Sequence, residues 1–173
     1  MDEPIYNVLF LCTGNSARSI LAEALLNHLG QGRFIAHSAG SQPTGEVNPL
    51  ALATLEQQQI AVERPRSKRW DEFAGDDGSS RGLDIIITVC DSAAGEVCPV
   101  WPGSPVTAHW SIKDPAGVTG SDALKRAAFL EAFEALRARI QGLIALPVKT
   151  LDRVALKKRL NALGEHPHEI VAG

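Results

Sequence analysis

A cysteine and an arginine near the start of the chain have the spacing of an anion-binding loop. Cys12 and Arg18 enclose five residues, and Gly14 between them permits a tight backbone. The segment follows an apolar run and precedes a predicted helix, so its amides could form a nest for an oxyanion at the helix N-terminus. Arg18 adds a planar fork that can hold two oxygens of a tetrahedral oxyanion. The pattern predicts an oxyanion site, although this spacing can also arise by chance.

The position of Cys12 would favour its ionised form. The positive end of a helix and the charge of Arg18 both stabilise a thiolate, so we expect the pKa of Cys12 to lie well below that of a free thiol. Ser19 could donate a hydrogen bond to the sulfur. A thiolate beside a bound oxyanion is a nucleophile. The alternative is a structural cysteine at the end of a buried strand.

Two further cysteines could exchange disulfides with Cys12. Cys90 ends a second apolar run, and Cys98 lies in the glycine- and proline-containing loop that follows. If Cys12 and Cys90 end neighbouring strands, their Cα atoms would lie about 5 Å apart, which a disulfide tolerates. Cys98 could then approach Cys90, as thiol–disulfide exchange requires. Inert core thiols and a zinc site are the alternatives, but the histidines supply no matching cluster of ligands.

Asp114 is the candidate proton donor. It precedes Pro115, which favours an extended backbone, and it lies on a loop beyond a predicted strand. A carboxylate at an anion site can act as a general acid, whereas a turn-forming Asp-Pro pair is the alternative. A small basic cluster is interpreted as a solvated face: Arg64, Arg66, Lys68 and Arg69.

The elements that position these residues alternate between strands and helices. Four apolar or β-branched runs predict strands: 8–11, 34–37, 83–89 and 106–110. Three segments predict helices: 19–29, with Leu21, Leu25 and Leu29 on one face, 49–59 and 122–145. A tail helix is also expected at about 151–163, although its apolar residues suggest no clean stripe. This order indicates an α/β fold with a parallel sheet. Cys12, Cys90 and Asp114 all follow strands, so they share the carboxyl end of the sheet, where ligands bind.

Length and composition set the context. The 173 residues are 45% hydrophobic and 21% charged, with a net charge of −3, which gives no hint of nucleic acid or an anionic membrane as partner. The first residues lack the basic region of a signal peptide, so we expect a cytoplasmic protein. In such a reducing compartment its three cysteines indicate catalytic or metal-binding groups and not structural bridges. We expect a catalytic domain at 1–147 and a C-terminal helical extension and tail at 148–173.

Residues 8–19, VLFLCTGNSARS, resemble the signature of the low-molecular-weight tyrosine phosphatase superfamily. The similarity extends through 38–40 and 88–90 to 114–116. It implies a three-layer sandwich around a four-stranded parallel sheet of order 2-1-3-4. It also implies that one continuous loop binds the oxyanion: Thr13, Gly14, Asn15, Ser16, Ala17, Arg18 and Ser19.

Within the superfamily the chain resembles the arsenate reductases more than the phosphatases. Their pattern has a cysteine closing the third strand, a second cysteine shortly after, and a tryptophan-containing segment before Asp-Pro-Ala. Cys90, Cys98 and Trp110 match these features. No aromatic residue follows Pro115 to grip a phosphotyrosine ring, which argues against an aryl phosphate substrate. Some arsenate reductases hold potassium; Asn15 and Glu23 match two of its ligands, but a basic residue, around Arg69, stands where an acidic one is expected.

The resemblance implies a redox relay. Cys12 attacks arsenate held by the loop and Arg18, and Asp114 assists the departure of water. Cys90 then attacks Cys12, and Cys98 passes the disulfide outward to a thioredoxin or to a glutaredoxin/glutathione system. No tightly bound cofactor or metal is implied. A phosphomonoesterase, which needs neither Cys90 nor Cys98, and a non-catalytic anion-binding domain are the alternatives.

Overall fold

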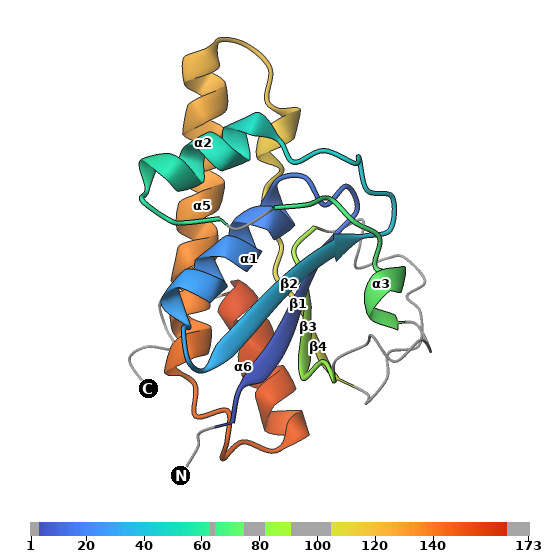
Figure 1. The fold of residues 1–173 in the computed structure, drawn as a ribbon. Coiled ribbons are helices and arrows are strands. Elements are labelled where there is room, and N and C mark those ends of the chain that lie inside the picture. The colour runs from blue at the N-terminus through green and yellow to red at the C-terminus, as the bar shows by residue number, and fades with distance from the viewer. Residues whose placement is uncertain (1–3, 63–64, 75–81, 91–104, 166–173) are drawn as a thin grey trace.

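A four-stranded parallel sheet forms the centre of the molecule (Figure 1). The computed structural model describes residues 4–62, 65–74, 82–90 and 105–165. The strands lie in the order β2-β1-β3-β4, so the predicted α/β fold and strand order are confirmed. Their bounds are β1 (Tyr6–Cys12), β2 (Phe34–Gly40), β3 (Ile85–Thr88) and β4 (Val106–His109). β2 runs three residues past the predicted 34–37 because 38–40 continue to pair with the end of β1.

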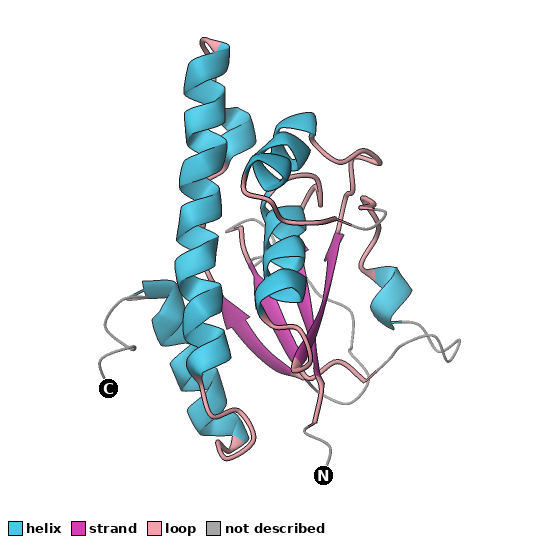
Figure 2. Ribbon diagram, turned by 60° about the vertical axis from the view of Figure 1, so that its left-hand side comes forward, coloured by secondary structure: helices cyan, strands magenta, loops and turns pink. Residues whose placement is uncertain are grey.

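The larger helices, α1, α5 and α6, cover one face of the sheet, and the short helix α3 lies beyond the other face (Figures 1 and 2). The described helices are α1 (Arg18–Leu29), α2 (Pro49–Gln57), α3 (Asp71–Ala74), η1 (Pro115–Gly117), α5 (Asp122–Ala145) and α6 (Arg153–Glu165). Helix α5 has the predicted bounds, and the Ser121 side chain caps its start by accepting a hydrogen bond from Leu124 N. No helix in the described parts of the chain combines the length and apolar character needed to cross a membrane.

The two faces of each central strand pack into different clusters, as the two-residue period of a strand requires. Val8 and Phe10 of β1 join the larger core with α1, α5 and α6. Leu9 and Leu11 face the other way and pack in a smaller cluster with Trp70. Both faces are apolar, which is typical of a parallel sheet buried on both sides.

The three leucines predicted to share one face of α1 are not equally buried. Leu21 and Leu25 are fully buried, but Leu29 is 37% exposed. Each four-residue step advances the side chain by about 40° around a helix of 3.6 residues per turn. Two steps carry Leu29 off the buried face, and Leu26 is buried in its place.

The tail helix α6 packs on β4. Leu156, Leu160 and Leu163 are buried, so the helix does present one stripe at +4 and +3 spacing, contrary to expectation. The Trp110 Nε1–H donates to the Leu160 carbonyl at 2.8 Å, and Trp110 itself is fully buried. Helix α6 therefore supports the segment between β4 and Asp114 through its contact with Trp110. The division of the chain at residue 147 stays a prediction.

Candidate active site

The loop between β1 and α1 is anchored through its carbonyl groups. The carbonyls of Thr13, Gly14 and Ser16 accept hydrogen bonds of 3.0, 3.0 and 2.8 Å from amides within 42–48. Carbonyls turned outward leave the peptide N–H groups able to turn inward. Ala17 occupies the N-cap of α1 without a side chain that could accept from the first turn. The loop therefore has donors to offer an anion where a capping side chain would otherwise take them.

Asn15 is the side chain that holds the loop in shape. It is fully buried and has a φ of 46°, in the left-handed region that asparagine tolerates better than most residues. Its Nδ2 donates to Ser19 Oγ at 2.8 Å, and its Oδ1 accepts from Lys68 N at 2.8 Å. The Ser19 oxygen is thus occupied by Asn15, and a hydrogen bond from its hydroxyl to Cys12 stays a prediction.

Gly40 allows the end of β2 to approach the loop closely. A Cβ at this position would lie 2.4 Å from the Thr13 carbonyl oxygen and 2.9 Å from that of Cys12. Only glycine fits between these backbones. The residue lies in the 38–40 segment singled out by sequence, but its steric role follows from pairing with distant Cys12, which no local pattern could reveal.

Cys12 and Cys90 lie together at the carboxyl ends of neighbouring strands. β1 pairs with β3, and both thiols are buried, at 6% and 2% exposure. The Thr13 hydroxyl, one residue beyond Cys12, lies 3.7 Å from the Cys90 sulfur, and the Cys90 side chain is the largest influence on the pKa of Cys12. The structure brings the two cysteines together as expected. Cys98 lies outside the described residues, and its part in disulfide exchange stays a prediction.

The neighbouring thiol changes the acidity expected of Cys12. The hydrogen bond with Cys90 and burial raise the pKa of Cys12, and the charge of Arg18 and the Gly14 amide only partly oppose the rise. The expectation of a lowered pKa is therefore wrong for this arrangement. Two thiolates in contact repel one another, so the pair retains a proton to higher pH. The sequence shows the helix end and Arg18 but not the distance between the two sulfurs.

Arg18 joins the loop to the segment that carries Asp114. One guanidinium nitrogen donates to the Ile112 carbonyl at 2.9 Å, and the other lies 3.8 Å from Asp114 Oδ2. Asp114 Oδ1 accepts from Ala116 N at 2.9 Å and so caps the short helix η1. Asp114 therefore forms the turn through Oδ1 and faces the anion loop through Oδ2.

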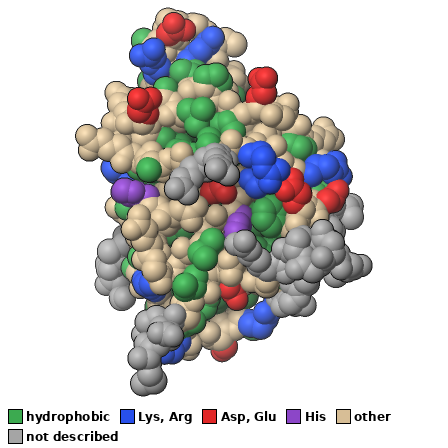
Figure 3. Space-filling view, in the orientation of Figure 1, with side chains coloured by type: hydrophobic (Ala, Val, Ile, Leu, Met, Phe, Trp, Pro, Cys, Tyr) green, Lys and Arg blue, Asp and Glu red, His purple; other side chains and the backbone are tan. Residues whose placement is uncertain are grey.

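The basic cluster beside the loop is largely neutralised. Arg66 makes two hydrogen bonds to Glu72 at 2.7 and 2.9 Å, and Arg69 pairs with Asp71 at 2.7 Å. Acidic and basic side chains are also interspersed on the face seen in Figure 3. Arg66 and Arg69 are exposed and form a solvated face, as the sequence suggested, whereas Lys68 is partly buried, contrary to that expectation. Arg64 lies outside the described residues.

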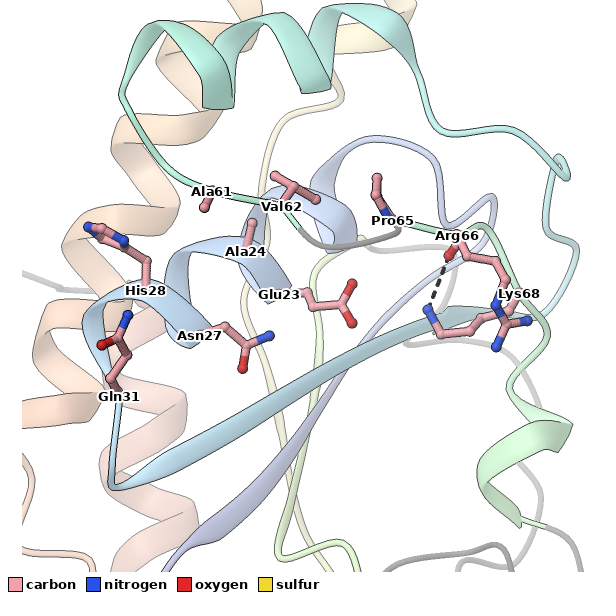
Figure 4. Close-up of a pocket in the computed structure, with 10 residues that line it drawn as sticks. All are labelled: Glu23, Ala24, Asn27, His28, Gln31, Ala61, Val62, Pro65, Arg66 and Lys68. Atoms are coloured by element: carbon pink, nitrogen blue, oxygen red, sulfur yellow. Dashed lines mark hydrogen bonds between the residues drawn. The ribbon is translucent and has the colours of Figure 1, made fainter.

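The structure does not favour a metal ion. Within residues 4–62, 65–74, 82–90 and 105–165, no three His, Cys, Asp or Glu side chains gather to hold one. The resemblance implies that a potassium ion could bind beside Glu23. In this structure the ammonium group of Lys68 faces that position (Figure 4). The basic residue is thus Lys68 and not Arg69. An ammonium in that position does not fit a second cation, so the chemistry below uses no ion.

Family membership follows from sequence comparison. A sequence model of the low molecular weight phosphotyrosine protein phosphatase family matches residues 7–155. The chain belongs to this family. It is 33% identical over 135 residues to an arsenate reductase of Halalkalibacterium halodurans, covering 78% of this chain and 91% of that protein. It is 29% identical to a glutaredoxin arsenate reductase of Synechocystis, covering 80% and 95% of the two chains.

Solved structures agree with this family assignment. The thioredoxin-dependent arsenate reductase of Corynebacterium glutamicum matches 83% of this chain with a TM-score of 0.59 and 30% identity, although only 62% of that longer chain is covered. An arsenate reductase solved in its intermediate state has a TM-score of 0.63 and 28% identity, with 98% of its chain covered. A low-molecular-weight tyrosine phosphatase at 21% identity shares the fold.

Proposed function

We propose that this protein is an arsenate reductase that uses Cys12 as its nucleophile and Cys90 as the second electron-donating thiol. The placement of these two buried thiols at the ends of paired strands, beside an anion loop, carries the proposal. Reduction of arsenate needs two electrons, and two adjacent thiols that end as a disulfide supply them. The named arsenate reductases among its relatives support this choice of oxyanion.

The first step forms a covalent adduct. Arsenate binds to the loop amides and to Arg18, whose planar fork suits two oxygens of a tetrahedral anion. Cys12 loses its proton to an oxygen of the bound arsenate, and its sulfur attacks arsenic and forms an S–As bond. Asp114 passes a proton to the departing oxygen, which leaves as water. Arsenic remains As(V), so no electrons have yet been transferred.

The second step is the reduction. The Cys90 sulfur attacks the Cys12 sulfur and forms an S–S bond, while the S–As bond breaks. The electron pair of the broken bond stays on arsenic, which becomes As(III) and leaves as arsenite. The two sulfurs have together lost two electrons. Because Cys12 and Cys90 end neighbouring paired strands, the attack needs little chain movement.

The last step restores the thiols. Cys98 attacks Cys90, the Cys12 thiol is released, and the disulfide becomes Cys90–Cys98. A thioredoxin or a glutaredoxin/glutathione system then reduces it by further thiol–disulfide exchange. Such systems keep cytoplasmic thiols reduced, and we place the enzyme in that compartment.

Phosphate ester hydrolysis is the main rival function, since Cys12, Arg18 and Asp114 would suffice for it. A phosphocysteine is hydrolysed by water, so a buried second thiol in contact with the nucleophile would have no chemical role. Residues 116–117, alanine and glycine, also offer no ring to an aryl phosphate. The thiol pair therefore favours reduction over hydrolysis.

The direct test is arsenate-dependent oxidation of NADPH. The purified protein is assayed with thioredoxin and thioredoxin reductase, and in parallel with glutaredoxin, glutathione and glutathione reductase. We expect turnover with at least one couple and none with Cys12→Ser. Hydrolysis of para-nitrophenyl phosphate without arsenate-dependent turnover by either couple would overturn the proposal.

A further inference from the structure

A pocket behind the anion loop contains two opposite charges that the proposed reaction does not use. Glu23 and Lys68 line a pocket of about 590 Å³ between α1 and the described residues 61–62 and 65–68 (Figure 4). The Glu23 carboxylate points toward the end of the Lys68 side chain. Apolar neighbours such as Ala24 and Val62 line much of the remaining wall. The two charged groups thus face one another, and both side chains are partly buried.

Glu23 needs a positive charge nearby. The Ser38 hydroxyl donates to Glu23 Oε1 at 3.0 Å. Burial raises the pKa of Glu23, and the charge of Lys68 is the largest influence opposing that rise, with a smaller one from Arg66. Because Glu23 is partly buried, keeping its carboxylate ionised without a counterion costs free energy.

Lys68 connects that charge to the anion loop through its own backbone. Its Nζ donates to the Arg66 carbonyl at 3.1 Å. Its amide donates to Asn15 Oδ1 at 2.8 Å, and its carbonyl accepts from Gly40 N at 2.9 Å. Any force that holds the Lys68 side chain near Glu23 therefore also holds the peptide that fixes Asn15.

Asn15 makes this connection matter for the loop. Its backbone has a positive φ, which the loop must stabilise by other contacts. Its side chain joins the Lys68 peptide to Ser19 at the start of α1. Displacement of Lys68 would remove one of the two partners of the Asn15 amide group, and the loop amides would lose part of their fixed orientation.

We propose that the ammonium group of Lys68 is the built-in counterion of Glu23 and positions the anion loop through Asn15. A fixed lysine thereby stands where a free monovalent cation could otherwise balance the carboxylate. Oxyanion binding by this protein should then be independent of potassium. This inference rests on the proposed anion site and adds a positioning residue to it.

The experiment measures how well phosphate protects Cys12 from iodoacetamide. The phosphate concentration for half-protection is determined in potassium chloride and in tetramethylammonium chloride, whose cation is too large for close contact with Glu23. The wild-type protein should give the same value in both salts. Lys68→Met should need about tenfold more phosphate in tetramethylammonium, an effect within the usual range of coupled charges. Potassium should recover part of that loss.

Three further variants separate positioning from general damage to the fold. Lys68→Arg retains the positive charge and should restore most of the affinity. The double variant Glu23→Gln/Lys68→Met removes both charges and should bind phosphate better than Lys68→Met alone. Lys158→Met, a change to an exposed lysine of α6, should leave phosphate binding unchanged. The double variant also keeps the test open if the single variant does not fold.

The outcomes distinguish this inference from the proposed function. Wild-type protein that phosphate does not protect would contradict the anion site itself. Normal protection of the wild type with an unchanged Lys68→Met variant would overturn only the role of Lys68. A wild-type protein whose phosphate affinity rises with potassium would overturn it as well.

Discussion

The two halves of the proposed site are built in different ways. In the anion loop, Cys12, Asn15 and Ser19 are buried at 6%, 0% and 0% exposure. The Asp114 side chain is 49% exposed and meets the loop only through a 3.8 Å approach to Arg18 among the contacts described. The loop is thus fixed before a ligand arrives, whereas the carboxylate stands at the solvent side. The comparison indicates that the loop supplies preorganised binding and Asp114 supplies a proton at the surface.

The largest effect should come from the nucleophile in the buried half. Cys12→Ser should abolish both arsenate reduction and any phosphatase activity, because an alcohol holds its proton far more tightly than a thiol and cannot form a disulfide. The coupled NADPH assay and para-nitrophenyl phosphate hydrolysis measure the two activities. Phosphate should still bind, since the loop amides and Arg18 remain. Residual reductase turnover in this variant would place the nucleophile elsewhere.

A smaller effect is expected from the exposed half. Asp114→Asn should slow formation of the arsenate adduct by about 10²–10⁴-fold, the usual contribution of general acid assistance. Anion affinity should change little, because the loop makes the binding contacts. Rapid-quench measurement of the first turnover gives the rate, and Lys113→Met provides a matched control on the same segment. An unchanged first-turnover rate would move the proton source to another group.

The contact between the thiols gives a pH prediction. Cys90 raises the pKa of Cys12, so Cys90→Ala should lower it. Iodoacetamide reacts with the thiolate, and the pH of half-maximal alkylation should therefore fall in the variant. A fall of one pH unit would make alkylation below both pKa values about tenfold faster. An unchanged or higher midpoint would mean that Cys90 does not hold the proton on Cys12.

The smallest effect concerns the support behind Asp114. Trp110→Phe removes the hydrogen bond to the Leu160 carbonyl but keeps a large ring beside Phe10. We expect a loss of about 1 kcal/mol in the free energy of unfolding, seen as a lower midpoint in thermal denaturation. Phosphate protection of Cys12 should not change, because Trp110 supports the segment that carries Asp114 and not the anion loop. Weaker protection would show that α6 also supports the loop.

The sequence predicts those parts of the structure that depend on local pattern. The apolar runs of β1 and β3, the bounds of α5 and the strand–loop–helix at Cys12 are all predicted, because each is encoded within one short segment. The sequence does not predict the contacts that join distant segments. Gly40 beside Thr13, and Lys68 bonded to Asn15, involve residues whose own neighbours in sequence carry no signal.

The acidity of Cys12 shows the same limit. The local features predict a thiolate, and Arg18 and the Gly14 amide do lower the pKa of Cys12. The contact with Cys90 depends on the order of strands in the sheet, and it outweighs the local contribution. A charge state in a buried pair is therefore a property of the assembled fold.

The most direct test of the account is to trap the disulfide that reduction should leave behind. Cys98→Ala protein is mixed with arsenate without an external reductant, quenched with acid and alkylated, and its peptides are mapped by mass spectrometry. The account predicts one arsenite released per protein molecule and a Cys12–Cys90 disulfide. Arsenite release with Cys90 still alkylated, or with Cys12 joined to an external thiol, would contradict the thiol pair as the source of the electrons.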